Sequence, residues 1–185
     1  RGDRAQPAMR PIFLGLGSNI EREQRRVAGL GALAEFVRDL RCSPVFESRP
    51  VGIKSGNFYN LVVCGYTELS LHELDRRLKF IEADNGRYAP ERKGLPLDID
   101  VLLYDGLVGS FDGLELPRAE ILKNAFVLWP LALLAPEAGH PVAGKPFAEL
   151  WATAQIDQQL WPVPFVWRGA ELTPAALLQA YPTPS

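Results

Sequence analysis

The chain has few of the residues on which several classes of protein depend. Among its 185 residues are two cysteines, Cys42 and Cys64, and two histidines. Two cysteines are too few for a disulfide framework, and no group of Cys and His has the spacing of a zinc site. Cys64 lies in an apolar run, where a free thiol behaves as a small hydrophobic side chain. This composition is typical of a reducing compartment, and we predict a cytoplasmic protein.

An excess of charge of one sign and long hydrophobic runs are also absent. The 20 basic and 22 acidic residues give a formal net charge of -2, without the strongly basic balance of a dedicated nucleic-acid binder. No segment approaches the 18 apolar residues of a membrane-spanning helix. We therefore predict no nucleic-acid and no membrane partner. The length predicts one domain, and the sequence gives no indication of an oligomeric state.

Hydrophobic periodicity predicts six elements in the order β-α-β-β-α-β. We expect a strand over 12–16, a helix over 20–40, an extended segment over 43–51, a strand over 58–66, a helix over 71–83 and a strand over 97–103. Ser70 and Glu73 form a capping box at the start of the second helix. This order is that of a ferredoxin-like α+β sandwich. Further helices are expected over 116–135, interrupted at Trp129-Pro130, and over 146–153 and 174–181.

Two carboxylates open the last of these strands. Alternate side chains of a strand share a face, so Asp98 and Asp100 point the same way, roughly 7 Å apart. The apolar residues of the strand point the other way: Leu97, Ile99, Val101 and Leu103. Two neighbouring like charges favour a cation between them, and oxygen ligands suit Mg²⁺. The alternative is a solvated strand end that binds nothing.

A loop rich in cations directly precedes the acidic strand. Arg87, Arg92 and Lys93 lie between Gly86 and Gly94. Phosphoryl transfer uses metal ions on phosphate oxygens together with cationic side chains that spread the transition-state charge. Cations and carboxylates this close in sequence therefore fit that chemistry, although an ordinary solvated loop has the same composition.

Two further polar residues are candidates for ligand binding. Glu82 lies at the end of the capped helix, beside the cationic loop, and offers hydrogen-bond acceptors to a substrate. Asn60 lies within an apolar strand, where its amide combines a donor and an acceptor that suit a flat heterocycle. A surface glutamate and an amide that satisfies a nearby turn are the plainer interpretations.

Several motifs follow one another in a specific order. They are Leu16-Gly17-Ser18-Asn19, Ser48-Arg49-Pro50-Val51-Gly52 with Phe58-Tyr59-Asn60, Ile81-Glu82 with Gly86-Arg87, Leu97-Asp98-Ile99-Asp100, and Ala125-Phe126-Val127-Leu128-Trp129-Pro130-Leu131. From about Pro11 to Trp151 the chain resembles the hydroxymethyldihydropterin pyrophosphokinases, which transfer pyrophosphate from ATP to a reduced pterin in folate biosynthesis. The resemblance implies a pyrophosphokinase-like domain over 10–153. Because Met9 is the only methionine, we expect residues 1–9 to be an upstream extension, and residues 154–185 form a proline-rich C-terminal extension beyond the resemblance.

The resemblance also implies roles for individual residues. Asp98 and Asp100 would hold two Mg²⁺ ions against the phosphates of ATP, the co-substrate. Arg87 would be a catalytic cation that contacts the phosphates, and Glu82 would bind ATP with it. From positions shifted relative to the family pattern, Arg92 is expected to add a second catalytic cation, and Lys93, Arg118 and Lys123 are expected to add charge for ATP binding. The pterin would contact Ser48, Val51, Gly52, Asn60 and Phe126, the last by stacking.

The chain departs from the family pattern around these residues. The usual Arg-Trp-Gly-Pro-Arg loop is replaced by the shorter Arg92-Lys93-Gly94-Leu95-Pro96, and the usual His-Tyr by Arg118-Ala119. Asn124 stands where a phosphate-binding arginine is usual. Two alternatives to pyrophosphate transfer onto hydroxymethyldihydropterin therefore stay open. One is a homologue that binds a pterin or nucleotide without catalysis, and the other is a pyrophosphokinase for a different reduced pterin.

Overall fold

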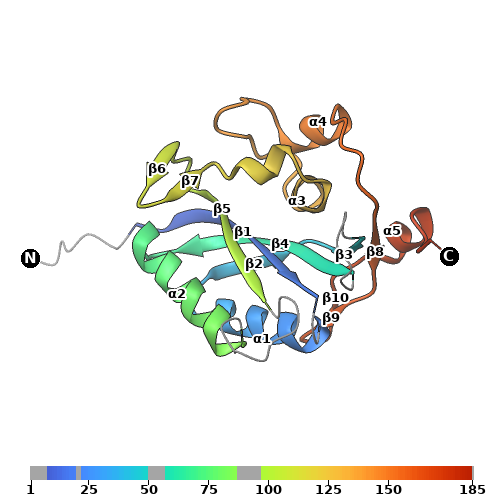
Figure 1. Ribbon diagram of the computed structural model, residues 1–185, viewed down its shortest axis with the longest axis horizontal. Coiled ribbons are helices and arrows are strands. Elements are labelled where there is room, and N and C mark those ends of the chain that lie inside the picture. The colour runs from blue at the N-terminus through green and yellow to red at the C-terminus, as the bar shows by residue number, and fades with distance from the viewer. Residues whose placement is uncertain (1–7, 20–21, 50–56, 87–96, 185) are drawn as a thin grey trace, which may run out of the picture.

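An antiparallel sheet lies between two layers of helices (Figure 1). The computed structural model describes residues 8–19, 22–49, 57–86 and 97–184. Among these residues, six strands form the main sheet: β1 (Arg10–Ser18), β2 (Arg38–Cys42), β3 (Val45–Ser48), β4 (Phe58–Thr67), β5 (Asp98–Tyr104) and β8 (Leu160–Val163). Their order is β5-β1-β4-β3-β8, and β2 also pairs with β4. The predicted ferredoxin-like α+β class is confirmed.

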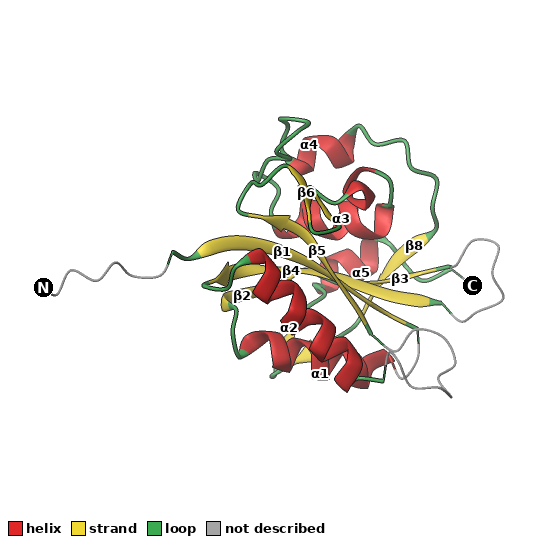
Figure 2. Ribbon diagram, turned by 60° about the vertical axis from the view of Figure 1, so that its left-hand side comes forward, coloured by secondary structure: helices red, strands yellow, loops and turns green. Residues whose placement is uncertain are grey.

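Two amphipathic helices, α1 (Arg22–Ala34) and α2 (Leu71–Asp84), cover one face of the sheet (Figure 2). Leu30 and Leu33 of α1 and Leu74 and Leu78 of α2 are buried against alternate residues of β1 and β4. The predicted capping box at the start of α2 is present. The hydroxyl oxygen of Ser70 accepts from the backbone N–H of Glu73, and the carboxylate of Glu73 accepts from the backbone N–H of Ser70. The apolar face of each helix is therefore fixed by local sequence.

The first helix ends earlier than its apolar pattern predicts. Val37 continues the helical spacing and is buried, but the chain has left α1 at Ala34 and enters β2 at Arg38. In β2, Asp39 takes a left-handed backbone conformation with φ of 55°, where the pairing with β4 shifts register. Charged residues and a bulge of this kind protect an edge strand from pairing with other chains.

The opposite face of the sheet is covered by α3 (Ala125–Leu134) and α4 (Phe147–Ala152), with a 3₁₀ turn, η1 (Ala119–Leu122), before them. Helix α3 is apolar around most of its circumference and is largely buried. Pro130 lies inside this helix, so the predicted interruption at Trp129-Pro130 is wrong. Buried contacts of Trp129, which stacks on Trp151 and packs against Phe46, compensate for the backbone donor that proline lacks.

Strand β5 contains an irregularity that changes which side chains face α3. Ile99 and Val101 pack with α1 and α2, as the alternation predicts. The pairing of β1 with β5 shifts register between Phe13 and Leu14, and beyond that point Leu103 packs with α3, beside Leu102. The prediction for Leu103 is therefore wrong, because one extra residue in a ladder reverses the alternation that follows it.

The remaining elements are short. They are the hairpin of β6 (Gly109–Phe111) and β7 (Leu114–Leu116), the pair β9 (Val166–Trp167) and β10 (Ala170–Glu171), and α5 (Ala175–Ala180). The expected helix near 174–181 is thus present as α5. Strand β8 is not anticipated by the sequence, because Pro162 is unusual in a strand, but an edge position tolerates it. Part of the C-terminal segment is therefore built into the main sheet.

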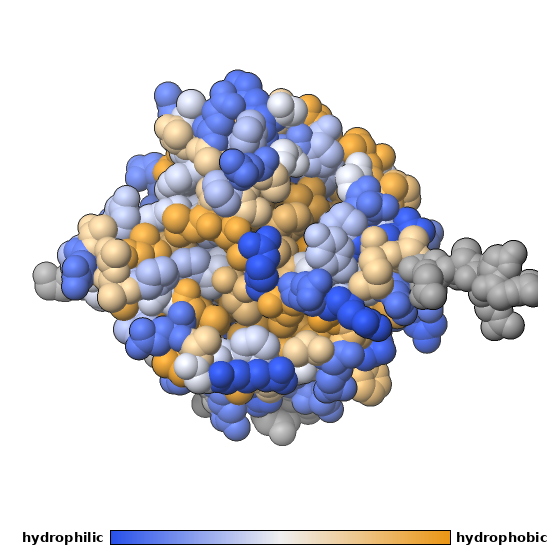
Figure 3. Space-filling view, turned by 180° about the vertical axis from the view of Figure 1, so that it is seen from behind, coloured by the Kyte–Doolittle hydropathy of each residue, from blue (hydrophilic) through white to orange (hydrophobic). Residues whose placement is uncertain are grey.

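On the side opposite Figure 1, hydrophobic side chains of the described residues gather in the middle of the face, with hydrophilic side chains among and around them (Figure 3). Among the described residues, no helix has both the length and the apolar character needed to cross a bilayer.

We expect one acid-sensitive contact in the turn before α4. His140 is 4% exposed, and its Nδ1 accepts from the backbone N–H groups of Val142, at 3.2 Å, and Ala143, at 2.9 Å. Only the neutral imidazole has an acceptor nitrogen, and burial lowers the pKa of His140. The unfolded chain therefore takes up this proton more readily, so the contribution is present above the ordinary histidine pKa of about 6.5 and is lost as the pH falls.

The variant His140→Asn tests this expectation, because an asparagine oxygen accepts from the same turn without titrating. Between pH 7 and pH 5 the Tm of the natural protein should fall by a few degrees more than that of the variant. Thermal unfolding in matched buffers measures the difference. Parallel dependence of the two Tm values on pH would show that His140 does not titrate against this turn.

Candidate active site

Two glycines of β1 form the floor of the site. Gly17 lies between Asn60 of β4 and Asp98 of β5, and Gly15 lies between Val62 and Asp100. A Cβ atom on Gly17 would lie 2.8 Å from the side-chain oxygen of Asn60, so a larger residue here would displace the Asn60 amide. The turn predicted to begin at Gly17 is wrong, because β1 continues to Ser18. The missed signal is the alternation of glycine with leucine, which leaves one face of the strand bare.

A cavity of about 190 Å³ opens above this floor. It brings together five of the residues that the sequence predicts for the site: Asn60, Asp98, Asp100, Arg118 and Phe126. They come from β4, β5, the start of η1 and the first turn of α3, which are far apart in the sequence. Both aspartates line the cavity, so the prediction that they share a face of the strand is confirmed.

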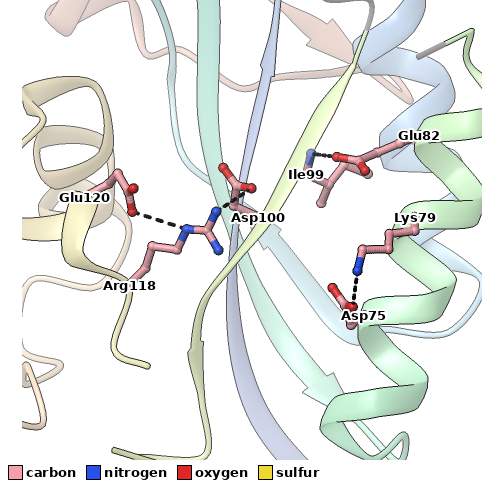
Figure 4. Close-up of polar contacts among 7 residues, drawn as sticks. All are labelled: Asp75, Lys79, Glu82, Ile99, Asp100, Arg118 and Glu120. Carbon is pink, nitrogen blue, oxygen red and sulfur yellow. Dashed lines mark hydrogen bonds and ion pairs between the residues drawn. The ribbon is translucent and has the colours of Figure 1, made fainter. Parts of the chain in front are cut away.

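Arg118 holds a charge beside the second aspartate (Figure 4). Its Nη2 lies 3.0 Å from Oδ1 of Asp100, and its Nε lies 3.2 Å from Oε2 of Glu120. The backbone N–H of Arg118 donates to the carbonyl of Leu102 at 3.0 Å, which fixes the residue against β5. The guanidinium is therefore oriented by two carboxylates and by its own backbone.

The electrostatic environment of Asp100 disfavours its charge. Burial and, after it, the neighbouring Asp98 raise the pKa of Asp100 to about 7, although the positive charge of Arg118 opposes both effects. A carboxylate held in this way gains from a cation placed beside it. A pair of carboxylates fits Mg²⁺, which takes one or two protein oxygens and completes its octahedron with water and phosphate oxygens. The described residues contain no larger cluster of His, Cys, Asp and Glu suited to a metal.

Glu82 contacts the backbone of β5 between the two aspartates. It is 6% exposed, and its Oε2 accepts from the backbone N–H of Ile99 at 2.7 Å (Figure 4). This hydrogen bond satisfies a donor on the outer edge of β5 and fixes the strand against α2. Its predicted contact with ATP stays a prediction, and the structure adds a contact that positions Asp98 and Asp100.

Of the predicted pterin-binding residues that the structure describes, Asn60 and Phe126 line the cavity, and Ser48 lies beside Asn60. The amide nitrogen of Asn60 lies 3.5 Å from the hydroxyl of Ser48, which is buried on β3. Phe126 is partly buried in the first turn of α3 and lines the same cavity as Asn60. An amide and an aromatic ring in one cavity are groups that bind the edge and the face of a flat ring.

Other predicted site residues lie elsewhere. Lys123 is exposed, and it is not among the described residues that line the cavity. Val51, Gly52, Arg87, Arg92 and Lys93 lie outside the described residues. Sequence reasoning did not assign Glu120, Asn124 or Gln158 to the site. Glu120 had a weak signal in its spacing of two from Arg118, whereas nothing local singles out Gln158.

Residues 13–136 match the family model of 7,8-dihydro-6-hydroxymethylpterin-pyrophosphokinase (HPPK). The chain belongs to the HPPK family. It is 34% identical over 144 residues to the 2-amino-4-hydroxy-6-hydroxymethyldihydropteridine pyrophosphokinase of Aquifex aeolicus, covering 76% of this chain and 90% of the relative. It is 37% identical over 134 residues to the enzyme of that name from Methylorubrum extorquens, covering 70% of this chain and 85% of the relative. The predicted resemblance is confirmed.

Larger proteins contain the same fold. The HPPK-DHPS protein of Plasmodium falciparum aligns with a TM-score of 0.69 over 91% of this chain at 12% identity, which shows the fold alone. The chain spans 50% of that protein, and 36% of the folate synthesis bifunctional protein of Chlamydia trachomatis, to which it is 31% identical over 164 residues. Membership of the HPPK family places the chain among the pyrophosphokinases of folate biosynthesis.

Proposed function

We propose that the chain transfers pyrophosphate from ATP to 6-hydroxymethyl-7,8-dihydropterin, with Mg²⁺, in the cytoplasm. The observation that supports this most directly is the single cavity shared by Asp98 and Asp100, suited to metal and phosphate, and by Asn60 and Phe126, suited to a pterin. Family membership and the cavity therefore favour the same reaction. Both substrates are small molecules.

In the proposed reaction Asp98 and Asp100 would hold two Mg²⁺ ions. When bound, these ions neutralise charge on the phosphate oxygens of ATP. Glu82 keeps the aspartates in place through the backbone of Ile99. Arg118, oriented by Asp100 and Glu120, presents a positive charge to the phosphates.

On the pterin side, Asn60 binds the edge of the ring and Phe126 supports its face. The hydroxyl oxygen of the pterin then attacks the β-phosphorus of ATP and gives up its proton to solvent. The bond from that phosphorus to the oxygen shared with the α-phosphate breaks, and AMP leaves. Arg87 and Arg92 are the proposed catalytic cations of this step. Val51, Gly52 and Lys93 are proposed to complete the binding sites.

Release of AMP tests the proposal. The protein is incubated with ATP, Mg²⁺ and the hydroxymethyl pterin, and AMP is expected in a one-to-one ratio with the pyrophosphorylated pterin. Omission of the pterin is the control for ATP hydrolysis. No AMP above that control at high protein concentration would contradict the proposal.

The departures from the family pattern support two alternatives. The AMP assay separates them when it is combined with calorimetry and with a panel of pterins. A homologue without catalysis would bind the pterin in a calorimeter but release no AMP. A pyrophosphokinase for another reduced pterin would release AMP only with a different member of a panel of pterins.

A further inference from the structure

Gln158 makes two hydrogen bonds to the start of α3 from outside the segment that matches the family. Its Oε1 accepts from the backbone N–H of Ala125 at 2.7 Å, and its Nε2 donates to Oδ1 of Asn124 at 3.2 Å. Ala125 is the first residue of α3, and Asn124 is the N-cap. Gln158 lies between α4 and β8, beyond the family match that ends at residue 136.

The orientation of both amides follows from the backbone. The N–H of Ala125 is a donor under all conditions, so the oxygen of Gln158 must face it. The nitrogen of Gln158 then faces Asn124 as a donor, and only the oxygen of Asn124 accepts from it. The remaining group of the Asn124 amide is therefore its NH₂, which is turned away from Gln158.

Asn124 is not used in the way that an N-cap asparagine normally is. Within the described chain, its side chain makes no capping hydrogen bond to its own helix, although asparagine is among the preferred N-cap residues. Gln158 supplies an acceptor for the first N–H of the helix instead. Asn124 lines the cavity together with Asp100, Arg118 and Phe126. Its amide is thus relieved of capping and held at the substrate cavity.

We propose that Asn124 is a substrate-binding residue, and that Gln158 is the positioning residue that turns the Asn124 NH₂ group toward the substrate. This inference rests on the proposed function and deepens it. The ligand group is an oxygen that accepts a hydrogen bond, on either the phosphate chain of the nucleotide or the pterin. A fixed neutral donor at this point discriminates between substrates by where they carry an acceptor.

The variant Gln158→Glu tests the proposal because it retains one contact and reverses the other. A carboxylate oxygen still accepts from Ala125, so the helix start is kept. The second carboxylate oxygen no longer donates to Asn124, whose amide must turn to donate its own NH₂ to the carboxylate. The oxygen of Asn124 then meets the substrate oxygen, and two acceptors oppose each other.

We expect Gln158→Glu to raise the KM of one substrate by about ten- to a hundredfold, the effect of losing a hydrogen bond to a charged or well-placed group. Its Tm should stay within a few degrees of that of the natural protein. Asn124→Ala should raise the KM of the same substrate, and the double variant should be no worse than Asn124→Ala alone. Titration of ATP at saturating pterin, and the reverse, identifies which substrate carries the acceptor.

Gln159→Glu is the matched control, because it introduces the same charge at the next residue, which is exposed and contacts Arg49 rather than the cavity. Its KM values should be unchanged. Unchanged KM values for Gln158→Glu, or a double variant clearly worse than Asn124→Ala, would overturn the inference while leaving the proposed function intact.

If the natural protein releases no AMP, the proposed function fails, and calorimetry then decides the inference separately. Mg²⁺ with a nonhydrolysable ATP analogue, and the pterin alone, are titrated into the natural protein and into Gln158→Glu. Weaker binding of one ligand to the variant supports the inference, and equal binding of both, or no binding of either to the natural protein, overturns it.

Discussion

Replacing Asp100 by asparagine is expected to abolish turnover and, in metal-free buffer, to stabilise the protein. Turnover should fall about a thousandfold or more, as it does when a charge that stabilises phosphoryl transfer is removed. The stabilisation has a different cause, which is the poor environment of the carboxylate in the folded chain. Burial and the repulsion of Asp98 together raise the pKa of Asp100 to about 7. An asparagine of the same shape carries no charge to bury.

The sign of the pH dependence follows from that pKa. An aspartate in an unfolded chain has a pKa of about 3.9, so the folded protein holds the Asp100 proton more tightly. The contribution of Asp100 to stability is therefore complete below about pH 4 and is lost as the pH rises through about 7. Asp100→Asn should raise the Tm at pH 8 and change it little at pH 4.

Two comparisons make this expectation decisive. Asp105→Asn is the matched control, because Asp105 directly follows the same strand but is exposed and pairs with Arg10 at the surface. It should alter neither turnover nor the Tm at pH 8. Mg²⁺ should raise the Tm of the natural protein but not that of Asp100→Asn. Retained turnover in Asp100→Asn would refute the metal role, and an unchanged Tm at pH 8 would refute the electrostatic argument.

The parts of the fold that the sequence predicts depend on local signals. The capping box of Ser70 and Glu73 places the start of α2, and the alternation around Ile99 places Asp98 and Asp100 on one face. These signals act within a few residues, where backbone geometry decides which side chains meet. The start of α2 and the shared face of Asp98 and Asp100 can therefore be predicted from the sequence alone.

The parts that the sequence does not predict depend on contacts between distant residues. Leu103 changes sides because β5 pairs irregularly with β1, and Pro130 stays in a helix because aromatic rings surround the preceding tryptophan. Gln158 lies 34 residues beyond Asn124 in the sequence, and only the folded chain brings the two side chains into contact. The spacing of residues in the sequence does not predict such contacts, because each depends on how distant parts of the chain pack together.

Replacing Glu82 by alanine is expected to lower kcat/KM by about a hundredfold, the loss that a displacement of about 1 Å produces in a positioned site. The substitution removes the acceptor of the Ile99 N–H, which lies between the two aspartates in a buried setting. A buried donor without a partner is costly, so the strand must shift or admit water. Either change moves Asp98 and Asp100 relative to Arg118.

Glu82→Gln separates this positioning role from a direct charge effect on ATP. Glutamine keeps an oxygen at the position that accepts from Ile99, so most of kcat/KM should be retained. The negative charge of Glu82 also contributes to the raised pKa of Asp100. Its removal should therefore move the acid limb of the pH profile of kcat/KM to lower pH. Equal losses in the glutamine and alanine variants, with no change of the pH profile, would instead assign Glu82 to charge-dependent binding of the nucleotide.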